Sequence, residues 1–189
     1  TFMVDILSGV PSIVAALFIF AMWITLFGFG RSDKPAEGYD YDMLAADLAG
    51  HAVVVTHPYE GGHPDHDAAA CAVQHACERM GAEAPIRLEF AGYHLGLDGP
   101  SAGVFFADEG LACAADPVDL GRKREALAAF ASQAEVLARF AGAPERLRLA
   151  PAYDFTQPPA PGAALYDRYG WPLTSEAWRT RVAETFTWA

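Results

Sequence analysis

The longest uninterrupted hydrophobic pattern lies near the start of the chain. Residues 6–30 contain no charged side chain, and the centre of this stretch, residues 13–24, is almost wholly apolar. About 20 such residues, each adding about 1.5 Å along a helix, are enough to span a bilayer. Pro11 suits the first turn of a helix, and Gly28 suits its end. The pattern predicts a single N-terminal transmembrane helix within residues 1–30.

The flanks of this stretch predict its type and orientation. A secretory signal is disfavoured because no basic side chain precedes the stretch and it ends in Phe and Gly. An uncleaved anchor is favoured, and the alternative is a fully buried core helix. Arg31 and Lys34 follow the stretch, so the positive-inside rule predicts a cytoplasmic C-terminal domain at the bacterial inner membrane. Without ionisable groups, residues 6–30 suit anchoring and packing against integral-membrane proteins.

Beyond this stretch the pattern changes to short alternating elements. Residues 31–40 form a polar linker with charges of both signs, and residues 41–48 predict a brief amphipathic helix before Gly50. Residues 52–55 are a continuous apolar run, typical of a strand that is covered on both faces in a parallel sheet. The remaining residues, 41–189, therefore predict an α/β domain.

The rest of the domain carries clear helix and strand signals. A helix is predicted from Pro64 to about Met80, with His63 as its cap and Gly81 as its stop. The other predicted elements are a strand at 86–91, a loop with a possible strand at 104–106, a helix over 122–140, an irregular proline-rich segment at 151–161 held by Tyr153 and Phe155, and a last helix over 176–186 with Trp178 and Val182 on one face.

Charge and cysteine content exclude two broad classes. The chain has 189 residues and a net charge of -11, with only 13 Lys and Arg in scattered positions. Nucleic-acid binding is disfavoured because phosphate contacts need clustered basic residues. Cys71, Cys77 and Cys113 form no CxxC pair. They predict buried, reduced thiols rather than a disulfide framework.

The candidate chemistry lies between the predicted strand and the helix that follows it. Residues 56–67 contain three histidines and three acidic side chains around a Gly-Gly pair. In open α/β sheets, the end of a strand next to a helix N-terminus is where ligands bind. Neutral imidazole and carboxylate side chains suit zinc and similar metals. The alternative is that His57 and His63 shape the loop by hydrogen bonds, while Asp65 and Asp67 favour the helix dipole.

The run His57-Pro58-Tyr59-Glu60-Gly61-Gly62-His63-Pro64-Asp65-His66-Asp67-Ala68 resembles the second motif of the LmbE-like (PIG-L) zinc-dependent de-N-acetylases. Further matches are Lys123, Ser132-Gln133-Ala134, Tyr153-Asp154-Phe155, and Tyr169-Gly170-Trp171-Pro172-Leu173-Thr174 with Trp178-Arg179. The resemblance covers about residues 41–189. It implies a Rossmann-like α/β sandwich.

The resemblance also implies roles for the motif residues. His66 corresponds to a zinc ligand, His63 to the histidine that stabilises the oxyanion, and Asp65 belongs to the same vestigial catalytic motif. The implied reaction is hydrolysis of an N-acetyl group on an amino sugar, in which zinc activates a water. The family's early His-Pro-Asp-Asp-Glu segment, which supplies two more ligands and the general base, is absent.

These observations predict a partial Rossmann-like sandwich preceded by a single transmembrane helix: an anchor at 1–30, a linker at 31–40 and a truncated LmbE-like domain at 41–189. The predicted function is that of a catalytically degenerate accessory subunit of a larger bacterial membrane complex, such as a respiratory or photosynthetic assembly, without a bound cofactor. The bilayer and integral-membrane proteins are the predicted partners.

Two alternatives stay open at this point. One is an active zinc-dependent de-N-acetylase whose missing ligands come from another chain, from His57 and its neighbours, or from an unfamiliar loop path. The other is that the apolar segment has replaced an original N-terminus by gene rearrangement or by an artificial join. Zinc content and acetate release separate the first alternative from the degenerate domain.

Overall fold

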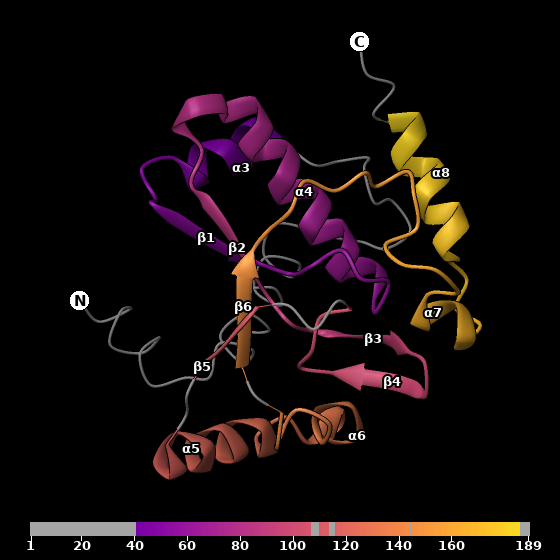
Figure 1. The fold of residues 1–189 in the computed structure, drawn as a ribbon. Helices are drawn as coiled ribbons and strands as arrows, with labels where there is room; N and C mark the ends of the chain where they lie inside the picture. Colours follow the sequence, from indigo (N-terminus) through magenta and orange to yellow (C-terminus); the bar gives the residue numbers. More distant parts are fainter. Residues whose placement is uncertain (1–40, 107–109, 114–115, 144, 186–189) are drawn as a thin grey trace.

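A small mixed sheet with helices on both sides forms the centre of the computed structural model, which describes residues 41–106, 110–113, 116–143 and 145–185 (Figure 1). The strand order is β1-β2-β6-β5. The strands are β1 (Val53–Thr56), β2 (Ile86–Phe90), β6 (Glu145–Leu149) and β5 (Leu111–Cys113). Only β1 and β2 are parallel, and the pairs β2–β6 and β5–β6 are antiparallel. A separate hairpin pairs β3 (Tyr93–Gly96) with β4 (Gly99–Ala102).

Helices connect and cover these strands. Their bounds are α3 (Tyr41–Leu48), α4 (Pro64–Met80), η1 (Gly81–Glu83), α5 (Pro117–Ala128), η2 (Ala131–Gln133), α6 (Ala134–Leu137), α7 (Leu165–Arg168) and α8 (Ser175–Thr185). Figure 1 shows α3 beside α4, and α5 with α6 at the other end of the sheet. Leu44 of α3 packs against Ala72 and Ala76 of α4, which holds α3 to the domain.

The two faces of the four-stranded sheet differ in chemistry, because side chains alternate along a strand. One face carries Arg87, Glu89 and Arg148, and Arg87 donates to Gln74 Oε1 of α4 at 3.1 Å. The other face carries aliphatic side chains and Phe90. Phe90 and Leu147 on this face pack against α5 and α6. The sheet thus separates a polar, helix-covered face from an apolar face that is covered at one end.

The main core lies between α4, α8 and the segment at 151–161. Trp178 of α8 has no exposed surface, and Tyr59, Phe155 and Cys71 pack around it. Tyr59 stacks on Trp178 with ring centroids 5.5 Å apart. The irregular segment is therefore held by its aromatic side chains, as predicted, and Trp178 and Val182 share the buried face of α8.

The fold class predicted from the sequence is wrong. Among the residues that the structure describes, no helix is both long enough and apolar enough to cross a membrane. The predicted anchor at 1–30 and the linker at 31–40 lie outside the described residues. The sheet is also small and mixed rather than a Rossmann-like sandwich, because the chain returns through a hairpin and antiparallel strands instead of repeated parallel crossovers.

Several local predictions need correction as well. The predicted helix over 122–140 is α5, which begins earlier at Pro117, followed by a break at Phe130 and the short helices η2 and α6. Residues 104–106 are not a strand, whereas the hairpin β3–β4 was not predicted. The expectation that β1 is covered on both faces is wrong too, since Val53 and Val55 are exposed. By contrast, the predictions of α3, β1, α4 and β2 are confirmed to within one residue at each end.

Candidate functional site

The candidate site occupies the loop from the end of β1 to the start of α4. His57 follows the last residue of β1 directly, and Pro64 begins α4. The loop is closely fitted to the hairpin: a side chain at Gly62 would overlap the carbonyl oxygen of Tyr93, the first residue of β3. The loop therefore has one tightly defined position against β3.

The three motif histidines form a cluster of packed rings. The rings of His57 and His66 stack with centroids 3.9 Å apart and planes 14° apart. His63 lies next to His66, with ring centroids 5.3 Å apart. His57 and His66 are buried, whereas the side chain of His63 is 28% exposed. The structure thus brings together the three histidines that the sequence singled out.

Burial keeps these imidazoles neutral. It lowers the pKa of His57 to about 3, with the nearby His63 adding to the effect. It lowers the pKa of His63 to about 4. The pKa of His66 also falls well below its usual value, because of burial and the two neighbouring imidazoles. The cluster is therefore uncharged at neutral pH.

His63 has a defined structural role at the start of α4. Its backbone is extended, and its ring Nδ1 accepts a hydrogen bond from the backbone N–H of Asp65 at 3.1 Å. This satisfies one of the N–H groups that a helix N-terminus leaves without a partner. The Asp65 carboxylate lies 3.7 Å from the same ring nitrogen. The cap predicted at His63 is confirmed, with the imidazole as the capping group.

Replacing His63 tests this capping role. We expect His63→Ala to lower the free energy of unfolding by about 1 kcal/mol, the usual effect of losing a cap. His63→Asn is the matched control, because an asparagine side chain also caps a helix and should retain most of that stability. Urea denaturation measures both variants. Equal losses in the two variants would show that the ring contributes by packing instead.

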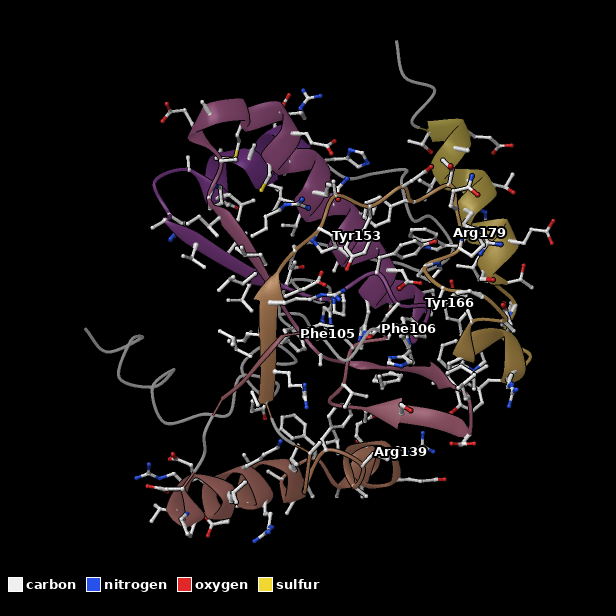
Figure 2. The ribbon with its side chains drawn as sticks, viewed as in Figure 1. Phe105, Phe106, Arg139, Tyr153, Tyr166 and Arg179 are labelled. Carbon is white, nitrogen blue, oxygen red and sulfur yellow. The ribbon has the colours of Figure 1, made fainter. Side chains whose placement is uncertain are left out.

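Asp67 holds the loop from inside. It has no exposed surface, and its Oδ1 accepts from the backbone N–H groups of Glu60 at 3.2 Å and Gly61 at 3.0 Å. The Tyr166 hydroxyl of α7 donates to Oδ2 at 3.2 Å. Figure 2 shows Tyr166 beside the N-terminal part of α4. Burial raises the pKa of Asp67 to about 8, although the two N–H groups act in the opposite direction.

A buried acid–histidine pair ties the loop to the hairpin. Glu60 and His94 of β3 are both buried, and His94 Nδ1 lies 3.2 Å from Glu60 Oε2. The Phe106 ring packs on His94 with centroids 3.8 Å apart. Burial raises the pKa of Glu60 against the opposing effect of His94. A side chain at Gly92 would overlap Glu60 Oε1, so the carboxylate would have to move to admit one.

A second buried network lies below the loop on the polar face of the sheet. Glu89 has no exposed surface and accepts from Arg148 Nε at 2.5 Å and from the Tyr153 hydroxyl at 2.7 Å. The Arg148 guanidinium also lies over the Phe105 ring, 4.1 Å from its centroid. In Figure 2, Tyr153 lies above Phe105. The network joins β2, β6 and the segment after β6.

Aromatic side chains surround the exposed edge of the histidine cluster. The His63 ring meets Trp171 edge-on with centroids 4.9 Å apart, and the Tyr93 ring meets His66 in the same manner at 5.2 Å. Tyr169 stacks on Trp171, and both rings are partly exposed. Tyr169 and Trp171 are among the residues near the C-terminus on which the resemblance to the LmbE-like family rests. The structure brings both rings next to the histidine cluster.

The residues present do not fit a zinc site. A zinc ion lies in the plane of each imidazole that binds it, at about 2.0–2.1 Å from the nitrogen. The nearly parallel, stacked rings of His57 and His66 cannot share one ion in this arrangement. Within the described part of the chain, no group of three or more His, Cys, Asp or Glu side chains could hold a metal. The zinc ligand predicted at His66 therefore belongs to no such group among the described residues.

Two cavities lie among the described residues. A small cavity of about 20 Å³ borders Glu60, Phe106 and residues 158–164, which leaves room for about one water. A larger surface cavity of about 440 Å³ is lined by Thr156 and residues of α8, including Glu176 and Arg179. Neither cavity is lined by His57, His63 or His66.

Sequence reasoning missed the partners that fix the loop. His94 is 34 positions from Glu60, and Tyr153 is 64 positions from Glu89, so no local spacing connects either pair. One signal was available, and it concerned β6: charged and apolar residues alternate in Glu145–Leu149, which is typical of a strand.

Comparison with known proteins gives a short, partial match. The phosphate transport system permease protein PstA of Mycobacterium leprae is 72% identical over 32 residues, and PstA 1 of Mycobacterium tuberculosis is 66% identical over the same length. The aligned residues make up 17% of this chain and 10% of each permease. No family model and no solved structure matches the chain. The resemblance to the LmbE-like enzymes stays a prediction.

Proposed function

We propose that this chain is a catalytically degenerate LmbE-like domain that acts as an accessory subunit of a larger bacterial membrane complex. The observation that carries the proposal is the use of the motif side chains within the fold. His63 caps α4, His57 stacks on His66, and Asp67 binds the loop backbone. Groups engaged in this way are held in place by structural contacts and do not converge on a metal.

Association with a membrane is part of the proposal. Its support is the short match to the mycobacterial permeases, which covers 32 residues. We also propose that residues 41–189 lie on the cytoplasmic side of the inner membrane. Fractionation of cells that produce the full chain tests this part. We expect the chain in the membrane fraction, and recovery in the soluble fraction alone would contradict membrane association.

Metal content and turnover test the degenerate character directly. We expect the purified full chain to hold less than stoichiometric zinc and to release no acetate from N-acetylglucosamine derivatives. His66→Ala should then leave both measurements unchanged, since no group of three or more His, Cys, Asp or Glu side chains in the described part of the chain could hold a metal. Stoichiometric zinc together with turnover that His66→Ala abolishes would overturn the proposal and establish the de-N-acetylase instead.

A further inference from the structure

The turn of the β3–β4 hairpin carries the one Asp-Gly pair of the sequence, Asp98-Gly99. In such a pair the backbone nitrogen of the glycine can attack the side-chain carboxyl carbon of the aspartate, because the glycine has no side chain to hinder the approach. The sequence contains no asparagine, the other residue that reacts in this way. Spontaneous rearrangement of the backbone is therefore expected to concentrate at this one bond.

The surroundings of this pair are open. Asp98 is exposed, and within the part of the chain that the structure describes no residue holds its carboxylate by a hydrogen bond or an ion pair. Gly99 has a φ of +124°, and a side chain built on it would meet no atom of a non-neighbouring residue within 4 Å. There is accordingly room beside the backbone for a ring that joins the two residues.

The end of the hairpin next to this turn is weakly held. β3 and β4 form a sheet of two strands, and a hairpin of this size is marginally stable unless other elements support it. Gly96 pairs with Gly99 at the turn, and Pro100 comes next. Glycine has no side chain to pack across the pair, and proline has no N–H to donate to the ladder. The turn can thus open locally while the rest of the hairpin stays paired.

The same hairpin supports the candidate site. The Tyr93 ring meets His66 edge-on, and His94 Nδ1 lies 3.2 Å from Glu60 Oε2 in the histidine loop. Both Tyr93 and His94 belong to β3, which has only four residues. A change in the turn therefore acts within one short strand of the contacts that hold the loop.

We propose that Asp98 converts spontaneously to isoaspartate in the folded chain and that the modified hairpin loosens its hold on the histidine loop. The Gly99 nitrogen forms a bond to the Asp98 side-chain carboxyl carbon, and the amide proton and the carboxyl hydroxyl leave together as water. Water then opens the resulting cyclic imide at either carbonyl. One opening restores aspartate, and the other leaves the main chain running through the former side chain. The composition is unchanged, and water is the only co-reactant.

Isoaspartate changes the geometry of the turn. It adds one methylene carbon to the main chain between Leu97 and Gly99 and leaves the former backbone carboxyl group as a short side group. The pairing of Gly96 with Gly99 fits a turn without that extra atom, so the modified turn cannot keep it in the same register. This inference goes beyond the proposed function, because it depends neither on zinc nor on a membrane partner.

Ageing of the purified full chain at physiological temperature and neutral pH gives the first test. Peptide mapping with enzymatic methylation of isoaspartyl groups should show isoaspartate rising with time at Asp98. The exposed Asp119, which precedes a leucine, should stay unmodified. Asp98→Glu is the matched control, because it keeps the charge but cannot close the same five-membered ring. No rise at Asp98, or a rise only in urea, would show that the folded turn protects the bond and would overturn the proposal.

Asp98→Asn gives an independent measure of ring closure. Asparagine forms the same imide with loss of ammonia, and hydrolysis of that imide leaves an acid of higher mass. We expect the intact mass of this variant to rise during the same incubation, faster than isoaspartate forms in the native chain, because ammonia leaves more readily than the hydroxyl of a carboxylate. A variant that keeps its mass would contradict the proposal.

Hydrogen exchange tests the effect on the candidate site. The aged chain is separated by ion-exchange chromatography into a fraction with isoaspartate and a fraction without it. We expect faster amide exchange of residues 93–102 and of the loop residues 57–63 in the modified fraction, with unchanged exchange in the middle of α4. Equal exchange of the loop in both fractions would overturn the proposed effect on the site. Zinc content and acetate release report separately on the proposed function.

Discussion

Glu89→Ala is expected to lower the free energy of unfolding by about 3–5 kcal/mol, because it removes the buried carboxylate that pairs with the half-buried Arg148 guanidinium. Glu89 has no exposed surface, and Arg148 Nε lies 2.5 Å from its Oε1. The Tyr153 hydroxyl loses its acceptor in the same variant. Chemical denaturation followed by circular dichroism measures the effect.

The control for this prediction removes both charges. Glu89→Ala combined with Arg148→Met should recover part of the lost stability, since the charge that Glu89 paired with is then removed as well. Arg148 also packs over the Phe105 ring, so recovery will be incomplete. If Glu89→Ala alone costs less than about 1 kcal/mol, the pair contributes no more than a surface ion pair, and the network does not hold β2 to β6.

Replacing Asp67 is expected to have the second large effect. Asp67→Ala removes the acceptor of two buried backbone N–H groups and of the Tyr166 hydroxyl. Each buried donor left without a partner costs about 1–3 kcal/mol, so a total loss of about 3 kcal/mol or more is expected. Asp67→Asn is the matched variant, because its amide oxygen can still accept from the Glu60 and Gly61 N–H groups.

The pH dependence of these Asp67 variants has a definite sign. The pKa of Asp67 is raised from 3.8 to about 8 in the folded chain. The unfolded chain therefore loses this proton first, and the contribution of Asp67 to stability falls as pH rises from about 3.8 to about 8. Asp67→Asn has no proton to lose, so its stability relative to the native chain should increase across this range. A constant difference would show that Asp67 is ionised throughout.

Much of the strand–loop–helix unit was predictable because its signals are local. Pro64 at the helix start and Gly81 at its end act within one turn, and the apolar run at β1 stands out from its neighbours. The length of α5 was misjudged because Asp116 caps the helix from outside the predicted range, with its Oδ1 accepting from Val118 and Asp119. Helix composition alone does not reveal where such a cap lies.

The sequence indicated which residues form the candidate site, but not how their side chains are arranged. The sequence singled out the three histidines of residues 56–67 as candidate ligands, and the structure packs their rings together. Whether their rings stack or converge depends on contacts from β3 and α7, which lie far along the chain. Long-range pairs such as Glu60 with His94 leave no periodic signal in a single sequence.

The glycine that brings the loop against the hairpin limits what this loop can become. Because even a methyl group at position 62 would collide with the backbone of Tyr93, any larger residue there would push the loop and β3 apart. A saturation-mutagenesis library selected for folded chains should accordingly retain only glycine at this position. Grafting a longer or bulkier segment into the loop would first require rebuilding the turn of the neighbouring hairpin.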